Sequence, residues 1–375
     1  MAPDPVVLHV LEALEGGTAR HLVDLVRHTP GVTQHVAIPA RRVGGLTDAT
    51  AATRLADAGA VVHLVDMRRL PCSPVNAKAL LDLRRLIRQV QPDVVHAHSS
   101  VGGALGRVAA ATAGVPSVYT PNGLATGRGA LLIERLLGRV TARVVAVSPS
   151  EAELVRASRI IAADHIAIIA NGIGPDHATP GPDLRALFGI PTGAQLVGTI
   201  ARLVAQKAPE RFVAVAADVL AARPDSHVVL IGDGPLRSLV TGSKALAPVS
   251  ARFHHLPALD DAAGVIDQLD VFVLTSRFEG APYAVMEAMR AAVPVVLTDV
   301  VGSRDLVVDG DSGILVTEHD TTAMARAVIA LLDDPARIAG LGAAGRRRVA
   351  ARYAAPNMGA SVRELYDLVI CSGNT

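Results

Sequence analysis

Short apolar runs alternate with longer segments of helical periodicity along the whole chain. The short runs have the length of buried strands, whereas longer segments such as 77–90 and 102–113 space their apolar residues as helices do. Strands that alternate with helices form parallel sheets with helices on both faces, so the pattern predicts an α/β fold. The predicted strands are 6–10, 35–38, 61–65, 94–97, 117–119, 144–147 and 166–169, followed by 196–200, 228–231, 253–256, 271–274, 295–297 and 314–316.

The periodicity stops in residues 171–182, where glycine and proline dominate. Such a segment is typical of an interdomain linker, so we place the boundary between the two series of strands there. A chain of 375 residues also has the length of about two ordinary domains. We therefore expect two similar α/β domains that face each other across a cleft.

Charge balance and cysteine content narrow the function class. The 36 basic residues nearly cancel the 35 acidic ones, which favours neither a nucleic-acid partner nor a membrane surface. Cys72 and Cys371 lie far apart in the sequence, so we predict neither a disulfide framework nor a zinc site. The first residues lack a basic segment and an apolar core, and no apolar run has the ~20 residues of a membrane span. We therefore expect a cytoplasmic protein without a signal peptide.

The most informative stretch is 276–289, with the sequence SRFEGAPYAVMEAM. Pro282 suits the first position of a helix, so Glu279 and several backbone N–H groups are expected at the helix mouth, where an anion is favoured. Glu287 follows about a turn and a half into that helix. The segment thus offers one acid beside an anion site and a second acid further along the helix. This pair suits a ligand with a phosphate end and several hydroxyl groups, as in a nucleotide sugar.

Two cations follow the first strand of the second series. Arg202 comes at the carboxyl end of this strand, and Lys207 lies just before the next helix. Ligands of parallel sheets bind beyond the carboxyl ends of strands, and two cations there suit a diphosphate that leaves with growing negative charge. A solvated pair on a loop is the alternative, which the two-glutamate stretch disfavours. Gly232, in the turn 232–235, is expected to line the cleft.

The N-terminal half contains weaker candidates. Gly16 and Gly17 open a helix whose amides could approach a phosphate or sugar, but taken alone the pair is better explained by a plain turn. The three-glycine dinucleotide fingerprint is absent. His98 ends a strand and could bind a substrate hydroxyl, although a structural role explains it equally well. His96 shares its face, but no cysteine or acid stands at ligand spacing, so we predict no metal site.

Two acidic segments are interpreted as structural. Asp309 and Asp311 could hold a divalent ion on a diphosphate, but the glycines around them and the strand that follows favour a turn. Ser148 and Glu151 have the spacing of a capping box at the start of a helix. Neither segment is part of the predicted site.

Together these motifs resemble the ordered motifs of the retaining GT-B glycosyltransferases of family 4 (group 1), over nearly the whole chain. The most specific part is the Glu-Gly-x-Pro-x4-Glu-Ala-Met arrangement that begins at Glu279. The resemblance implies two Rossmann-like domains around a central cleft. The acceptor is expected mainly on the N-terminal domain (1–174) and the nucleotide sugar mainly on the C-terminal domain (175–355). The last helix, within 356–375, is expected to cross back to the N-terminal domain.

The resemblance also implies a role for each motif residue. Arg202 and Lys207 would neutralise the donor diphosphate, and Glu287 would accept hydrogen bonds from the ribose. Glu279 and the amides after it would hold the sugar hydroxyls, and His98 would contact the sugar near the reacting carbon. The expected catalytic residues are His98, Arg202, Lys207 and Glu279. The expected donor-binding residues are Gly16, Gly17, Arg202, Lys207, Gly232, Glu279, Gly280, Ala281, Pro282, Tyr283 and Glu287.

Three positions depart from the family pattern. Gly174 stands where an acid often follows Asn-Gly-Ile, and Asp305 stands where glutamate is usual. Asn122 occupies a Pro-x-Gly setting in which the family often has histidine, and it is our candidate for acceptor binding. These departures concern the linker and the acceptor, not the donor site.

We predict a metal-independent hexosyltransferase that transfers a sugar from a UDP-linked donor with retention of configuration. Arg202, Lys207 and a helix N-terminus would stabilise the leaving diphosphate without a metal or another cofactor. If the acceptor hydroxyl attacks the sugar from the same face that the diphosphate leaves, a diphosphate oxygen can take the proton of that hydroxyl. We therefore expect no separate catalytic base in the protein. Glu279 as a covalent nucleophile is the less favoured route. A nucleotide-sugar 2-epimerase and a two-domain sugar-binding receptor are the alternatives.

The acceptor is the part of the function that the sequence determines least. The chain has no Trp, four Tyr and five Phe, so we do not expect a platform for a large oligosaccharide. We find no basic-aromatic amphipathic helix of a membrane-docking kind in the N-terminal half; Arg84, Arg85 and Arg88 are interpreted as a solvated helix face. A small soluble acceptor is favoured, such as an aminocyclitol or amino sugar of bacterial natural-product (antibiotic) biosynthesis. A cell-surface or lipid-linked glycan precursor stays open.

Overall fold

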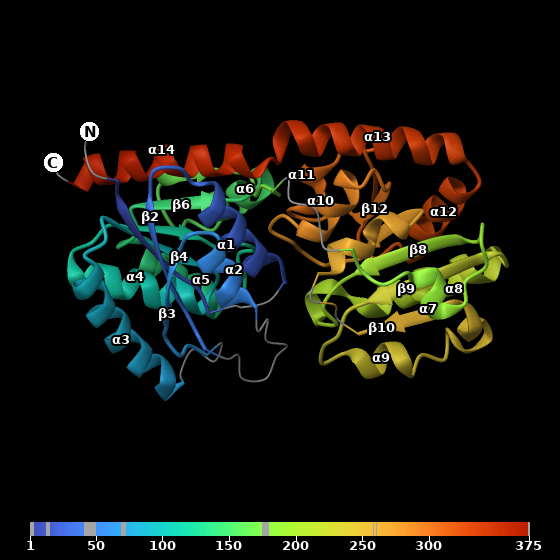
Figure 1. The fold of residues 1–375 in the computed structure, drawn as a ribbon, viewed down its shortest axis with the longest axis horizontal. Coiled ribbons are helices and arrows are strands. Elements are labelled where there is room, and N and C mark those ends of the chain that lie inside the picture. Colours follow the sequence, from blue (N-terminus) through green and yellow to red (C-terminus); the bar gives the residue numbers. More distant parts are fainter. Residues whose placement is uncertain are drawn as a thin grey trace. The chain divides into compact units, whose positions relative to one another are not determined.

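Two compact units make up the protein, each built on its own parallel sheet (Figure 1). The first unit comprises Met1–Gly174 and Ala354–Thr375, and the second comprises Pro175–Tyr353. The computed structural model describes residues 4–12, 16–40, 50–68, 73–174, 180–257, 259 and 261–373. Cys72 and residues 175–179 of the predicted linker lie outside these ranges. The predicted α/β class with two Rossmann-like parallel-sheet domains is confirmed.

The first sheet has seven parallel strands in the order β3-β2-β1-β4-β5-β6-β7. The order reverses between β1 and β4, which pair directly through Val7 with Val94 and His9 with His96. The strands are β1 (Val6–Val10), β2 (Thr33–Ile38), β3 (Val61–Leu64), β4 (Val94–His98), β5 (Ser117–Thr120), β6 (Arg143–Ala146) and β7 (Ile166–Ile168).

The second sheet has six parallel strands in the order β10-β9-β8-β11-β12-β13. Its order reverses between β8 and β11, which pair through Val197 with Val271. The strands are β8 (Gln195–Ile200), β9 (Ser226–Ile231), β10 (Phe253–Leu256), β11 (Val271–Leu274), β12 (Val295–Thr298) and β13 (Ile314–Val316).

Helices cover both faces of the first sheet, which explains why its strands are apolar on both sides. Val7 and Val94 pack with Tyr366 of α14 on one face, whereas Leu8 and Val95 pack with α3 and α4 on the other. The helices of this unit are α1 (Gly16–His28), α2 (Ala51–Asp57), α3 (Pro74–Val90), α4 (Val101–Ala113), α5 (Arg128–Gly138), α6 (Pro149–Ala157) and α14 (Ala355–Gly373).

In the second unit, α8 and α12 supply an apolar face that closes a core cluster on one side of the sheet. Phe212 and Val219 of α8 and Val328 of α12 pack there with Val228 and Val271 of the sheet. The helices are α7 (Leu184–Phe188), α8 (Pro209–Ala222), α9 (Arg237–Thr241), α10 (Tyr283–Arg290), α11 (Ser303–Leu306), α12 (Thr321–Leu332) and α13 (Pro335–Arg352), together with the short 3₁₀ turn η2 (Ala205–Lys207).

The residues predicted to begin helices α6 and α10 lie at the starts of these helices, but two details differ from the prediction. Ser148 caps α6 by accepting the N–H of Glu151 at 3.2 Å, but the Glu151 carboxylate binds the N–H of Val147 instead of closing a reciprocal box. Pro282 is the N-cap residue of α10 and not its first residue, so the helix begins one position later than predicted. None of the helices in the described residues is long and apolar enough to cross a bilayer.

Candidate functional site

The predicted diphosphate and sugar contacts of the second unit follow the two strands at which the strand order reverses. Arg202 and Lys207 come after β8, and Glu279 comes after its neighbour β11. Connections leave these two strands in opposite directions, so their carboxyl ends border the crevice in which open α/β sheets bind ligands. The topology therefore explains how residues separated in sequence meet at one edge.

Lys207 and Glu279 form one hydrogen-bonded unit, which the sequence did not predict. The Lys207 ammonium donates to Glu279 Oε1 at 2.5 Å, and the Ser276 hydroxyl donates to the same oxygen at 2.5 Å. The Glu279 side chain is only 6% exposed and that of Lys207 is 16% exposed, so water screens the pair weakly. A diphosphate that approaches Lys207 consequently meets a cation whose position is already fixed by a buried carboxylate.

The loop before α10 is bound to the turn η2 through several further hydrogen bonds. The Arg277 N–H donates to the carbonyl of Gln206 at 2.8 Å, and the Gln206 side chain donates to the carbonyl of Phe278 at 3.1 Å. The Thr275 hydroxyl donates to the Lys207 carbonyl at 3.2 Å. These bonds tie the Lys207 and Glu279 segments to each other, which favours a preorganised site.

Two glycines allow the backbone of this edge to pack closely. Gly232 has φ 144°, and a Cβ atom there would lie 2.0 Å from the carbonyl oxygen of Ala201, next to Arg202. Gly302 has φ 82°, and its Cβ would lie 2.3 Å from the carbonyl oxygen of Gly280. Gly232 was a sequence candidate, whereas Gly302 was missed because nothing in the local sequence shows that it touches the Glu279 loop.

The remaining donor candidates are placed at the start of α10. Glu287 is half-buried on this helix, whereas Ala281 and Tyr283 are buried at 8% and 5% exposure. Gly280 and Pro282 are also buried, so this segment offers backbone more than side chains to a ligand. Because the N-terminus of a helix favours an anion, an anionic part of a ligand at this segment stays a prediction.

In the first unit, the candidates lie where strand order reverses between β1 and β4. Gly16 and Gly17 begin α1 and are exposed, and residues 13–15 before them lie outside the described ranges. Glu12 was missed by sequence reasoning: its buried carboxylate accepts the Gly102 N–H at the start of α4 and the Ser99 hydroxyl, both at 2.9 Å. An acid two residues after a predicted strand was the available signal.

His98 ends β4 as predicted, but it lies inside a group of buried histidines instead of at an open strand end. Its ring is fully buried and stacks on His96 with 4.1 Å between ring centroids. His9 and His21 also pack against it, with centroid separations of 5.3 Å and 5.6 Å. Neither His9 nor His21 was a sequence candidate, because only the pairing of β1 with β4 and the packing of α1 bring them here.

Hydrogen bonds in this histidine group determine which nitrogen of His98 carries the proton. The Gln34 amide oxygen can only accept, so His9 donates to it through Nε2–H at 2.7 Å. Neutral His9 then accepts through Nδ1 from the Nε2–H of His98 at 3.0 Å. The His98 Nδ1 is left as a buried acceptor with no partner among the described residues. A substrate hydroxyl could donate to this atom.

Burial keeps the histidine group uncharged. It lowers the pKa of His9 to about 4 and that of His21 to about 3. The same desolvation holds the pKa of His96 and His98 well below the ordinary value. The group can therefore orient or accept, but it does not supply positive charge at neutral pH.

His9, His96 and His98 each place a ring nitrogen within 4.8 Å of the others, which raises the question of a metal. The rings of His96 and His98 stack on each other, with an interplanar angle of 29°. Both nitrogens of His96 are also engaged, with Tyr366 at 2.6 Å and Thr120 at 2.7 Å. The arrangement is that of a hydrogen-bond network, and independence from metal stays a prediction.

The buried histidines predict an acid-sensitive first unit. Between pH 6.5 and the lowered folded-state pKa, the unfolded chain binds protons that the folded one excludes, so stability falls as pH drops through this window. For His21 the loss should be about 2 kcal/mol at pH 5. His21→Leu removes this buried titratable ring, so it should reduce the pH dependence by that amount. Urea unfolding at pH 7.5 and pH 5 measures this, and an unchanged pH dependence would refute it.

Asn122, the acceptor candidate, follows the carboxyl end of β5. It adopts φ 55°, a left-handed conformation that asparagine tolerates better than most residues. Its side-chain nitrogen is buried without a partner among the described residues. The adjacent Gly123 N–H donates to the buried Glu151 carboxylate at 2.7 Å, which fixes the turn. An unpaired donor at this edge is compatible with ligand binding.

Comparison with protein families matches both units. Residues 15–177 match the model described as Glycosyltransferase Family 4, and residues 194–334 match the model described as Glycosyl transferases group 1. The Anabaena protein HepE, in a crystal structure with UDP and glucose, has a TM-score of 0.81 to this chain at 18% identity. That likeness covers 97% of this chain and 100% of HepE, and it concerns the fold.

Curated relatives have several different acceptors in their names. The D-inositol 3-phosphate glycosyltransferase of Arthrobacter sp. (strain FB24) is 30% identical and covers 77% of this chain and 76% of its own length. The UDP-Gal:alpha-D-GlcNAc-diphosphoundecaprenol alpha-1,3-galactosyltransferase of Escherichia coli is 29% identical over 68% and 70% of the two chains. The 2-deoxystreptamine glucosyltransferase of Streptomyces kanamyceticus is 28% identical over 74% and 78%. With the two-sheet fold and the matched motifs, these relationships show that the chain is a GT-B glycosyltransferase of family 4.

Proposed function

We propose that this glycosyltransferase transfers a hexose from a UDP-sugar to a hydroxyl group, with retention of configuration and without a metal. The observation that carries the proposal is the hydrogen-bonded Lys207–Glu279–Ser276 unit, which follows β8 and β11 where the strand order reverses. UDP as the nucleotide is supported by the ligands of HepE and by the donor in the name of the E. coli relative.

The residues of the second unit would divide the work along the donor. Arg202, Lys207 and the N-terminus of α10 face the diphosphate, whose negative charge grows as the bond to the sugar breaks. Glu279, held by Lys207 and Ser276, would position sugar hydroxyls, and Glu287 would bind the ribose. The departing diphosphate oxygen would take the acceptor proton on the same face, which yields retention without a separate base.

In the first unit, the unpaired Nδ1 of His98 would accept a hydrogen bond from a sugar hydroxyl near the reacting carbon. Gly16 and Gly17 would allow the start of α1 to approach the donor. Asn122 would contribute to acceptor binding. These three roles follow the family resemblance.

Two acceptor classes fit different observations. A small cyclitol or aminocyclitol is supported by the names of the inositol phosphate and 2-deoxystreptamine relatives, and by the scarcity of aromatic residues. A lipid-linked glycan is supported by the undecaprenol-linked substrate in the name of the E. coli relative. Transfer to the first class of acceptor would belong to natural-product biosynthesis, and transfer to the second would belong to the synthesis of cell-surface glycans.

One screen separates the acceptor classes and the rival reaction. The protein is incubated with UDP-glucose, UDP-galactose and UDP-N-acetylglucosamine, each with inositol phosphate, 2-deoxystreptamine or a polyprenyl-diphosphate sugar. Mass spectrometry should find a glycosylated product with one acceptor class. Conversion of the UDP-sugar to an epimer when no acceptor is present would instead identify a 2-epimerase.

The same screen tests metal independence. Transfer is expected to persist in excess EDTA, because Arg202, Lys207 and backbone amides stabilise the leaving diphosphate. Complete loss of transfer with EDTA, restored by magnesium or manganese, would contradict the proposal. It would also revive Asp309 and Asp311 as ligand candidates, although Asp309 Oδ1 accepts the N–H of Leu315 at 2.9 Å as part of a turn.

A further inference from the structure

Gln34 and His9 lie behind His98 in one chain of hydrogen bonds. Gln34 is on β2, His9 on β1 and His98 on β4, and these strands are neighbours in the first sheet. The Gln34 amide oxygen lies 2.7 Å from His9 Nε2, and His9 Nδ1 lies 3.0 Å from His98 Nε2. All three side chains are buried, so water does not compete for these bonds. The chain ends at His98 Nδ1, which has no hydrogen-bond partner among the described residues.

The hydrogen bonds of this chain can run in one direction only. The Gln34 oxygen must accept, so His9 Nε2 carries the single proton of a neutral ring and His9 Nδ1 must accept in turn. His9 stays neutral at pH 7 because burial lowers its pKa to about 4. His98 therefore donates through Nε2 and keeps a lone pair on Nδ1. A different residue at position 34 could reverse this order from two side chains away.

The ring of His98 is also held against rotation. It stacks on His96 with 4.1 Å between centroids, and His96 is itself fixed by Tyr366 at 2.6 Å and Thr120 at 2.7 Å. A half-turn of the His98 ring would replace Nε2 by a carbon and break the bond to His9. Packing and hydrogen bonding thus fix the same orientation, which preorganises the Nδ1 lone pair.

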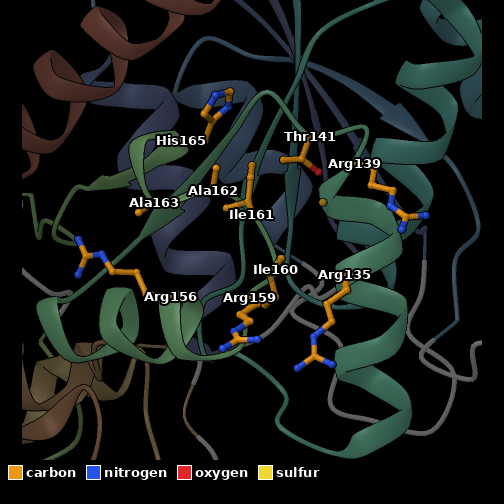
Figure 2. Close-up of a pocket in the computed structure, with 11 residues that line it drawn as sticks. Arg135, Arg139, Thr141, Arg156, Arg159, Ile160, Ile161, Ala162, Ala163 and His165 are labelled. Carbon is orange, nitrogen blue, oxygen red and sulfur yellow. The ribbon is translucent and has the colours of Figure 1, made fainter.

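The arginine-lined hollow drawn in Figure 2 does not supply the missing partner of His98. This hollow has a volume of about 750 Å³ and is lined by Thr141 and His165, which directly precede β6 and β7. It therefore lies at the amino ends of the parallel strands. His98 is the last residue of β4, at the carboxyl ends of the strands, where ligands of such sheets bind.

We propose that Gln34 and His9 are positioning residues that hold His98 as an obligate hydrogen-bond acceptor, so that the enzyme selects donors with a hydroxyl group at the contacted position of the sugar. The inference rests on the proposed contact between His98 and the donor sugar. A hydroxyl can donate to the Nδ1 lone pair, whereas fluorine or a carboxylate oxygen can only accept and would face that lone pair unpaired. Such an unpaired buried group rejects the wrong ligand more strongly than a missing apolar contact does.

Nitrogen-15 NMR of the histidine side chains tests the first step of the proposal without any donor. At neutral pH, His98 in the wild-type protein should carry its proton on Nε2 and none on Nδ1. The spectrum of His98→Gln identifies which signals belong to this residue. Protonation of His98 at Nδ1, or an equal mixture of the two tautomers, would overturn the proposal, whatever the behaviour of any variant.

Gln34→Glu should reverse the chain with little change of shape. A carboxyl group buried at this position takes up a proton, because an unpaired buried carboxylate is costly. The proton resides either on the carboxyl group or on His9 Nε2, and in both cases His9 donates through Nδ1 to His98 Nε2. His98 then carries its own proton on Nδ1 and presents a donor. The NMR signals of His98 should show this exchange of tautomers.

Binding of fluorinated donors tests the consequence for specificity. The probes are the UDP-hexose that the enzyme transfers and its monofluorinated analogues, one for each sugar hydroxyl group. Calorimetry should show that the wild type binds one of these analogues about 10-fold or more weakly than the parent donor. In Gln34→Glu this ratio should fall to about threefold or less, because Nδ1–H faces the fluorine. The ratios for the other positions should stay unchanged.

Gln89→Glu is the matched control, since it makes the same substitution at an exposed position of α3. It should keep the wild-type tautomer of His98 and the wild-type binding ratios. The proposal would be wrong if Gln34→Glu left the tautomer unchanged, if no fluorinated position responded to Gln34→Glu, or if Gln89→Glu had the same effect. Transfer of the unmodified UDP-hexose, measured separately, reports on the proposed function alone.

Discussion

Replacement of Lys207 by alanine should lower kcat about 100-fold or more while UDP-sugar affinity changes little. In the proposed mechanism the ammonium faces a diphosphate whose charge grows in the transition state, and the loss of one such donor typically costs about 3 kcal/mol. Arg202→Ala should have a comparable effect. Steady-state kinetics with saturating acceptor measures both.

The structure adds a second consequence for Lys207. Its removal leaves the Glu279 carboxylate, 5% exposed, without its cation, although Ser276 still donates to it. The double variant Lys207→Ala, Glu279→Gln should therefore lose less than the sum of the single losses. Lys244→Ala removes an exposed lysine of the same unit and serves as the control. A Lys207→Ala enzyme with normal kcat and only a raised donor KM would show that the side chain binds without catalysing.

Replacement of the two glutamates should separate nucleotide binding from sugar positioning. Glu287→Gln should weaken binding of UDP and UDP-sugar alike by roughly 1–3 kcal/mol, because a neutral amide holds the ribose hydroxyls less strongly than a carboxylate. Glu279→Gln should leave UDP affinity intact, since its amide oxygen can still accept from Lys207 and Ser276. Transfer by Glu279→Gln should nevertheless fall sharply. Calorimetry with UDP and transfer assays on both variants measure the difference.

An exposed glutamate on α14 offers a control for these changes, since Glu364→Gln removes the same charge far along the chain. It should alter neither UDP binding nor transfer. If Glu279→Gln and Glu287→Gln lost UDP affinity equally, the division of roles between the two acids would be wrong.

The fold could be predicted from the sequence because strand and helix periods differ and the strands are buried on both faces. Arg202, Lys207 and Glu279 could be selected because they follow predicted strands, and ligands bind beyond the carboxyl ends of such strands. What the local sequence could not show was the contact between Lys207 and Glu279. The 2.5 Å bond between Lys207 and Glu279 depends on β8 and β11 being neighbours.

The same reason explains the residues that were missed. Gly302 matters because its backbone passes Gly280, and His9 matters because β1 pairs with β4. Neither the contact of Gly302 with Gly280 nor the pairing of β1 with β4 can be predicted from the sequence around these residues.

The central claim is retaining transfer from a UDP-sugar without a metal. NMR of UDP-[1-13C]glucose with the enzyme and excess EDTA tests it most directly, even before the acceptor is known, because slow hydrolysis transfers the sugar to water. The first glucose released should be the α anomer, and it should not form with Lys207→Ala. Initial release of the β anomer would contradict retention, and release only after addition of a divalent metal would contradict metal independence.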